Sequence, residues 1–192
     1  MLIKLSRKAF SPFGVKELNQ FKLIHKEPLF IMGLFIKICL VFYSFPLIHS
    51  ELFIPFISNS ISNISLDPWN SFLLNGGDVN SFPYGISMLL AYLPVSSLGL
   101  FLDRIIGNSD FFEIGFKLTS FLFDYTVLII ISIITKHFSN RILLVSYWLS
   151  PIIIYTTYIH GQLDIVPVAF LLGCICMLGW NRYRYAALLI LL

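Results

Sequence analysis

Residues 86–102 read ISMLLAYLPVSSLGLFL, an apolar run of 17 residues with Pro94 near its middle. A helix needs about 20 apolar residues to cross a bilayer, and a proline removes one of its backbone hydrogen bonds. We therefore predict that this run enters the outer leaflet and turns back. The side of the membrane on which every later loop lies depends on this prediction, because a crossing helix would reverse it.

The distribution of basic residues favours the same arrangement. If residues 86–102 do not cross, ten Lys and Arg residues lie on the cytoplasmic side, and only Arg104 and Lys117 lie outside. If they do cross, the counts become eight and four. Loops that stay in the cytoplasm carry the excess of Lys and Arg. The chain is thus predicted to have a cytoplasmic N-terminus and an extracytoplasmic first loop.

The composition of the whole chain is that of a membrane protein. Of its 192 residues, 57% are hydrophobic and only 12% are charged, about half the charged share of an average soluble domain. Too few charges remain to cover a water-facing surface. The net charge of +3 is small and dispersed, so nucleic-acid binding is not expected.

The expected fold class is all-α, a polytopic integral membrane helical bundle. Residues 1–27 form a basic cytoplasmic tail and residues 28–192 the transmembrane domain. The predicted spans are 28–48, 118–135, 142–159 and 165–180, with another starting at 186. Residues 49–117 are predicted to form an external loop with interfacial or re-entrant helices. The last apolar run holds only seven residues, which predicts that the chain is truncated at its C-terminus.

Asp67 is the first candidate catalytic residue. It lies in the external loop beside Trp69, in a segment without Lys or Arg, where a carboxylate can act as a general base or bind Mg²⁺ or Mn²⁺. The alternative is that Asp67 caps a helix starting at Pro68, and both roles can hold together. Asp78, after two glycines, is interpreted as a turn residue.

Further polar residues are candidates for substrate binding. His160, Gln162 and Asp164 gather at a break between two apolar runs. Lys117 and Asp124 are seven residues apart and thus on one helical face. An ionisable residue within the membrane is by default functional or paired. Asp124 therefore either contributes to a site or pairs with Lys37 or a backbone group, and Lys37 itself needs an acidic or phosphate partner.

Aromatic residues near the ends of the apolar runs are interpreted as an interfacial belt. They are Trp148, Trp180, Tyr183 and Tyr185.

The order of these features resembles the N-terminal part of the GT-C superfamily of polytopic glycosyltransferases, and specifically its mannosyltransferase-like members. The resemblance covers roughly residues 28–180. Its parts are an acid in the first loop (Asp67), Gly76-Gly77 leading to Phe82-Pro83-Tyr84-Gly85, Lys117 with Asp124, Trp148-Leu149-Ser150-Pro151, and Gly161-Gln162-Leu163-Asp164. The family's first loop often carries a second acid where this chain has Asn70, which leaves a requirement for Mg²⁺ or Mn²⁺ open.

The resemblance implies transfer of a hexose such as mannose from a polyprenyl-phosphate donor, at the outer face of the membrane, to a lipid- or glycan-type acceptor. Asp67 would deprotonate the acceptor hydroxyl, and cationic groups would steady the departing phosphate. Two alternatives remain open. One is a transporter or flippase subunit for a lipid-linked or anionic substrate, and the other is a non-catalytic fragment.

Overall fold

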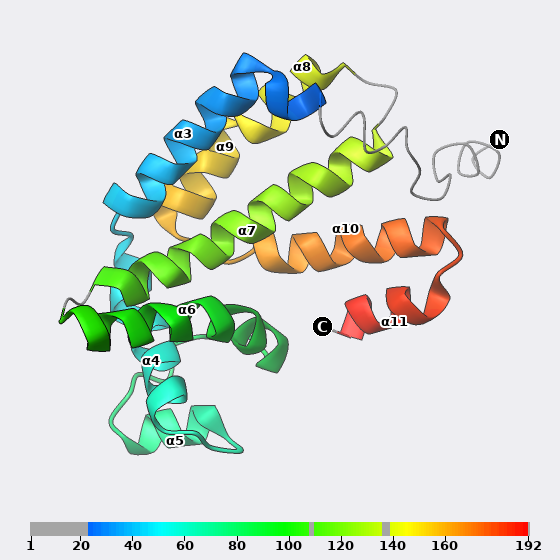
Figure 1. Cartoon of the computed structure of the whole chain (residues 1–192). Helices are drawn as coiled ribbons and strands as arrows, with labels where there is room; N and C mark the ends of the chain where they lie inside the picture. Colours follow the sequence, from blue (N-terminus) through cyan, green and yellow to red (C-terminus); the bar gives the residue numbers. More distant parts are fainter. Residues whose placement is uncertain (1–22, 108–109, 136–138, 192) are drawn as a thin grey trace. The chain divides into compact units, whose positions relative to one another are not determined.

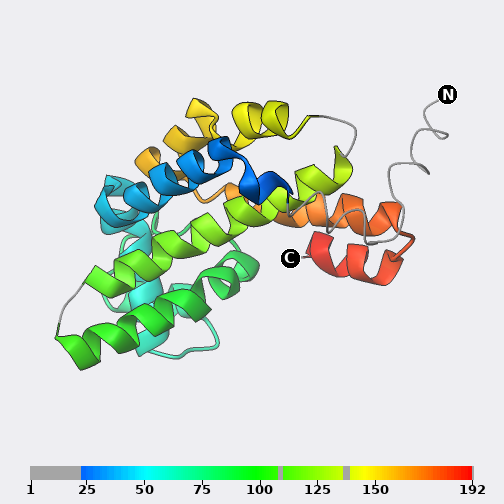
Figure 2. The same cartoon turned by 45° about the horizontal axis from the view of Figure 1, so that its top comes forward.

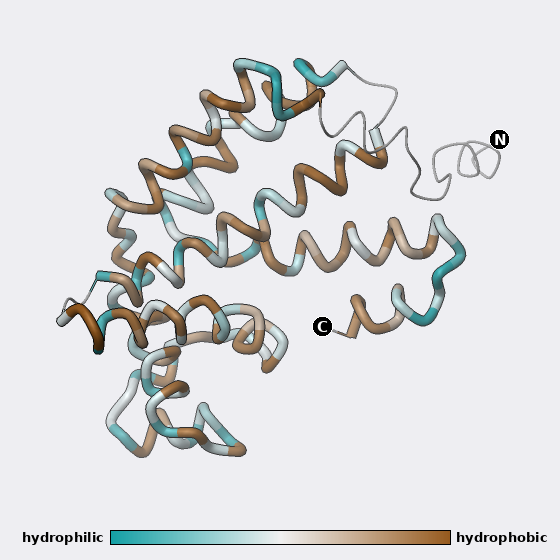
Figure 3. The backbone as a smooth tube through the Cα atoms, viewed as in Figure 1, coloured by the Kyte–Doolittle hydropathy of each residue, from teal (hydrophilic) through white to brown (hydrophobic). Residues whose placement is uncertain are grey.

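The computed structural model describes residues 23–107, 110–135 and 139–191, which form helices and no strand. The all-α fold class is thus confirmed for this part of the chain. Within it, three helices are long and apolar enough to cross a membrane: Ile86–Ile106, Asp110–Ile134 and Asn140–His160. Figure 3 shows the apolar character of these helices. Most of the predicted tail, residues 1–22, lies outside the described residues.

The chain divides into two compact units, each built from separate stretches of sequence. Unit 1 takes the described residues of Met1–Ile38, Leu122–Ile154 and Asp164–Leu192. Unit 2 takes those of Cys39–Phe121 and Tyr155–Leu163.

Unit 1 contains the antiparallel pair α10 (Ile165–Gly179) and α11 (Tyr183–Leu191), which lie side by side (Figure 1). It also contains the start of α3 (Pro28–Tyr43), on which Trp148 packs. The Trp148 indole stacks on Phe30 at 5.5 Å, donates to the Phe30 carbonyl at 3.0 Å and occupies the space beside Gly33. Trp148 is fully buried, so its assignment to an interfacial belt was wrong.

Unit 2 contains the first loop, and this loop is ordered around an aromatic cluster. Its helices are η1 (His49–Phe53), α4 (Ile54–Ser62) and α5 (Pro68–Leu74). Phe56 stacks on Phe82 with ring centroids 4.9 Å apart, and Trp69 donates its indole N–H to the Phe82 carbonyl at 3.2 Å. The loop thus contains short helices, and its aromatic residues give them a common core.

The helix α6 (Ile86–Ile106) corrects the expected length of the proline-containing run. It has 21 residues rather than 17 and continues through Pro94. Its length and hydropathy are those of a spanning helix, so shortness is no longer an argument that the segment turns back. The side assignment then rests on the distribution of basic residues alone.

The helix α7 (Asp110–Ile134) returns beside α6, and close helix contact in unit 2 depends on two glycines (Figure 2). A Cβ atom on Gly99 would lie 2.2 Å from the Phe111 carbonyl oxygen, and one on Gly115 would lie 2.7 Å from that of Val95. Small residues allow two helix backbones to approach in this way. Gly107 ends α6 in the left-handed conformation, with φ of 74°.

Other helix limits also differ from those predicted. The helix α3 ends at Tyr43, shortly before Pro46, rather than at residue 48. The helix α7 begins at residue 110 rather than 118. The stretch Asn140–His160 is widened into π-helical turns on both sides of a break at residues 149–150, where Pro151 has no N–H to donate.

Candidate functional site

Asp67 caps α5, as one of the two interpretations predicted. Its side-chain Oδ1 accepts a hydrogen bond from the backbone N–H of Asn70 at 3.1 Å, and Pro68 occupies the first position of the helix. The Asp67 side chain is exposed. The cap therefore fixes the direction of a carboxylate that is open to solvent.

A groove with mainly apolar walls is lined by residues that flank Asp67 in the sequence. Ser65 and Pro68, on either side of Asp67 in the sequence, line it together with Ile64. The opposite wall comes from α6 and includes Ile86 and Leu90. The groove has a volume of about 380 Å³. Because its walls are chiefly Ile, Leu and Pro side chains, it suits a hydrocarbon chain better than a free sugar.

Asp78 is a turn residue, as predicted. Its Oδ1 accepts from the backbone N–H of Asn80 at 2.7 Å and from the Asn80 side-chain amide at 3.1 Å. Asp78 is also exposed. Asp78 is thus a second loop carboxylate held by a nearby backbone N–H, as Asp67 is.

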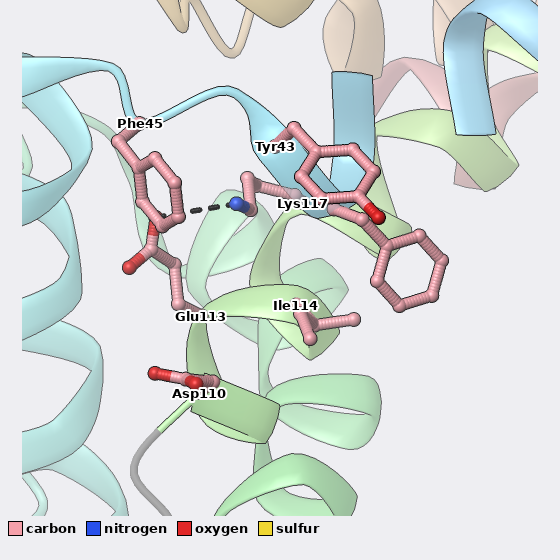
Figure 4. A pocket seen from close by; sticks show the side chains of 7 residues that line it. Tyr43, Phe45, Asp110, Glu113, Ile114 and Lys117 are labelled. Carbon is pink, nitrogen blue, oxygen red and sulfur yellow. Dashed lines mark ion pairs between the residues drawn. The ribbon is translucent and has the colours of Figure 1, made fainter. Parts of the chain in front are cut away.

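Lys117 lines a second pocket, of about 210 Å³, which we call the Lys117 pocket (Figure 4). Its ammonium donates to the Ser44 carbonyl at 2.8 Å, lies 3.3 Å from a carboxylate oxygen of Glu113 and lies 4.7 Å from the centre of the Phe45 ring. The side chain is only 5% exposed. The other lining residues are Phe42, Tyr43, Asp110 and Ile114. Lys117 is therefore a nearly buried cation whose charge Glu113 already balances.

Asp103 fixes the helix end that carries this pocket. Its two carboxylate oxygens accept from the backbone N–H groups of Phe111 and Phe112, each at 2.9 Å. This cap explains why α7 begins eight residues earlier than predicted, and it sets the position of Asp110 and Glu113 in the first turn. The sequence does not reveal this cap, because Asp103 lies within α6, seven residues before α7, whereas the usual capping signal stands immediately before the helix.

The predicted corner at residues 160–164 is joined to the start of the first loop. The His49 ring Nε2 donates to the Gly161 carbonyl at 2.8 Å, and the Ser44 hydroxyl donates to the Tyr158 carbonyl at 2.7 Å. Gly161 has φ of 84°, and a Cβ there would lie 2.7 Å from His49 Nε2. His49 is 1% exposed and lies outside the candidate spans. Burial lowers the pKa of His49 to about 4.

The three predicted side chains of that corner, His160, Gln162 and Asp164, differ in exposure and in the residues they contact. His160 is exposed and contacts the Tyr155 ring, whereas Gln162 is half-buried and its backbone N–H donates to the Thr156 carbonyl. Asp164 is exposed, belongs to unit 1 and begins α10 without a side-chain capping bond. In the described part of the chain, no hydrogen bond or ion pair joins Asp67 to Lys117, His160 or Gln162.

Asp124 forms the pair with Lys37 that was one of its two predicted roles. The Lys37 ammonium lies 2.5 Å from Asp124 Oδ2, and both side chains are fully buried in unit 1. Tyr147 donates its hydroxyl to Asp124 Oδ1 at 2.8 Å. Asp124 thus has ionic and hydrogen-bond partners of its own, separate from those of Lys117.

The residues described in the structure contain no group of three or more His, Cys, Asp or Glu side chains arranged to hold a metal ion. Asp67 supplies one carboxylate, and Asn70 stands where the resembled family often has a second acid. One protein carboxylate is a weak basis for an Mg²⁺ or Mn²⁺ site.

Comparison with known proteins identifies no relative. No protein-family model matches the chain, and no curated protein or solved structure shows significant similarity to it.

Proposed function

We propose that this chain is a membrane glycosyltransferase of the GT-C type, which transfers a hexose such as mannose from a polyprenyl-phosphate donor to an extracytoplasmic lipid or glycan acceptor. The observation that carries the proposal is the placement of Asp67. A capped, exposed carboxylate lies in the segment that lines a groove suited to a lipid chain, which supports a role for Asp67 as base toward a lipid-linked substrate.

The proposed reaction uses Asp67 as general base. The carboxylate takes the proton of an acceptor hydroxyl while that oxygen attacks the anomeric carbon of the sugar. The bond between the anomeric carbon and the phosphate oxygen breaks, and the phosphate leaves on its lipid with the bonding electron pair. The anomeric configuration inverts, because attack and departure occur on opposite faces.

The other predicted substrate residues fall into two groups. His160 and Gln162 belong to the same unit as Asp67 and remain proposed contacts for the sugar or its acceptor, whereas Lys117 lies in that unit but lines a pocket other than the groove. Asp124 and Asp164 belong to the other unit, and Asp124 is engaged by Lys37. Because Lys117 does not line the groove, stabilisation of the departing phosphate is not assigned to Lys117.

The test compares two substitutions that each keep a turn or cap while removing a negative charge. Asp67→Asn preserves helix capping, because Asn caps as well as Asp. Asp78→Asn is the matched control. Membranes containing each variant receive radiolabelled polyprenyl-phosphate mannose, and transfer to membrane lipids and glycans is measured. Asp67→Asn is expected to lower the rate about 100-fold or more, whereas Asp78→Asn stays within about twofold of the wild type.

Two results would overturn this proposal. Transfer by Asp67→Asn at the wild-type rate would remove Asp67 as the base. Absence of transfer by the wild-type chain from polyprenyl-phosphate mannose and from the corresponding glucose donor would remove the hexosyltransferase assignment.

A transporter or flippase subunit is the second candidate, and the Lys37–Asp124 pair favours it. Buried ionisable residues among apolar helices often line a transport path. This candidate predicts that Asp67→Asn leaves transport unchanged. The double variant Lys37→Met with Asp124→Leu, which removes both buried charges together, is expected to abolish movement of a fluorescent lipid-linked anion across proteoliposomes.

A further inference from the structure

The Lys117 pocket combines opposite charges with aromatic walls. Lys117 contributes one positive charge, and Asp110 and Glu113 contribute two negative charges, so the pocket carries a formal charge of −1. Tyr43 and Phe45 lie on either side of the Lys117 ammonium in Figure 4, and Phe45 is 68% exposed. A ligand of this pocket therefore needs a positive charge, and aromatic faces also attract cations.

The N-terminus of α7 does not supply a site for an anion here. Two of its first backbone N–H groups, those of Phe111 and Phe112, already donate to Asp103. The positive end of the helix is thus neutralised by a carboxylate. A ligand that carries only negative charge would be repelled by Asp110 and Glu113, and the helix end would offset little of that repulsion.

Lys117 nevertheless retains a place for one anionic oxygen. An ammonium has three N–H donors, and the structure uses two of them, toward the Ser44 carbonyl and toward Glu113. The third is available for a phosphate oxygen. The pocket is therefore complementary to a zwitterion, with a cationic group beside the two carboxylates and a phosphate beside Lys117.

The size and the sequence context of the pocket indicate the source of such a ligand. Its volume of about 210 Å³ is enough for a small head group but not for lipid chains. It lies where α7 changes from the charged residues 110–117 to an apolar sequence, and where α3 ends in aromatic residues. Such a change is typical of the level of the lipid head groups.

We propose that the Lys117 pocket binds the head group of an aminophospholipid of the phosphatidylethanolamine class. The primary ammonium of the lipid donates hydrogen bonds to the carboxylates of Asp110 and Glu113, and its phosphate accepts from Lys117. This lipid is distinct from the sugar donor, and the proposal does not depend on sugar transfer.

Native mass spectrometry of the full chain, released from nanodiscs, tests the proposal. The nanodiscs contain equal amounts of phosphatidylethanolamine, phosphatidylcholine and phosphatidylglycerol with the same acyl chains. The wild type is expected to retain phosphatidylethanolamine at least fivefold over either other lipid. In the double variant Asp110→Asn with Glu113→Gln, the ratio of retained phosphatidylethanolamine to either other lipid is expected to fall below two. The control Glu51→Gln, which removes an exposed acid of the same unit outside the pocket, keeps the wild-type ratio.

A second measurement requires no variant. Stepwise methylation of the lipid ammonium removes its N–H donors one at a time, so retention by the wild type is expected to fall with each methyl group. Equal retention of the three lipids by the wild type, or an unchanged ratio in the double variant, would overturn the proposal. Occupancy by soluble phosphoethanolamine at the same concentration as the lipid would overturn the assignment to a bilayer lipid.

Discussion

Lys37 and Asp124 form a fully buried ion pair whose nitrogen and oxygen atoms are 2.5 Å apart. Asp124 also accepts from the Tyr147 hydroxyl, and the Lys37 ammonium lies 3.7 Å from the centre of the Trp148 ring. The pair therefore joins α3, α7 and the helix that begins at Asn140 within unit 1. Its charges are stable among apolar residues because each has both an ionic partner and a second contact.

Asp124→Asn is expected to destabilise the protein by about 3–5 kcal/mol, because it leaves the Lys37 charge buried without its partner. The double variant Lys37→Met with Asp124→Leu removes both charges and is expected to recover most of that loss. Thermal unfolding in detergent measures both effects. Asp164→Asn, an exposed acid of the same unit, is the control and should change little. Equal stability of Asp124→Asn and the wild type would show that the pair contributes nothing.

Gly99→Ala is expected to destabilise unit 2 by about 1–3 kcal/mol, since the added methyl group meets the backbone of Phe111 rather than a movable side chain. Gly85→Ala is the matched control, because nothing lies within 4 Å of a Cβ at that position. The comparison uses the unfolding temperature of each variant in the same detergent. Similar temperatures for the two variants would contradict the close approach of α6 and α7.

The stability of the protein is expected to fall between pH 6.5 and pH 4 through His49. The native pKa is about 4, lowered by burial and by the nearby Lys117, while the ordinary value is 6.5. Between these values the unfolded chain binds a proton that the native state does not bind, so stability rises with pH across this window and is complete above it. The lowering of the His49 pKa corresponds to a contribution of about 3 kcal/mol to the free energy of unfolding.

The variant His49→Gln isolates this contribution. The Gln amide can still donate to the Gly161 carbonyl but does not titrate. The loss of unfolding temperature between pH 7.5 and pH 4.5 should therefore be smaller in His49→Gln than in the wild type. An identical loss in both proteins would exclude His49 as the titrating group.

Cysteines introduced at Asn80 and Arg104, one before α6 and one near its end, are predicted to react with an impermeant thiol reagent from the same, extracytoplasmic side. The native residues Cys39, Cys174 and Cys176 are first replaced by alanine. The expectation follows from the distribution of Lys and Arg along the chain. Labelling of position 80 alone from outside would show that α6 crosses and would reverse the orientation of the later loops.

The features that could be predicted from the sequence are those set by local rules. The Asp-Pro pair at residues 67–68 predicted a helix cap. An Asp side chain accepts a hydrogen bond from a free backbone N–H of the first turn, and Pro at the first helical position has no N–H that would lack a partner. The turn at Asp78 follows from the same chemistry. Because Asp124 lies in an apolar run, its predicted role was either part of a functional site or part of a structural pair, and Lys37 was one of the partners considered.

The features that could not be predicted depend on contacts between distant residues. Pro94 suggested a break, but a helix continues through a proline when other groups satisfy the freed carbonyl. Trp148 looked interfacial because it lies near the end of an apolar run, whereas the missing side chain of Gly33 makes room for it in the core. The Lys117 pocket depends on Ser44 and Phe45, 72 or more residues away in the sequence.

The bond from His49 to the Gly161 carbonyl also has a consequence for biosynthesis. Unit 2 is completed only by residues 155–163, so His49 emerges from the ribosome 112 residues before Gly161. Until then the buried imidazole and the Ser44 hydroxyl lack their acceptors. A nascent chain arrested before Tyr155 should therefore expose the first loop to proteases that the finished protein resists.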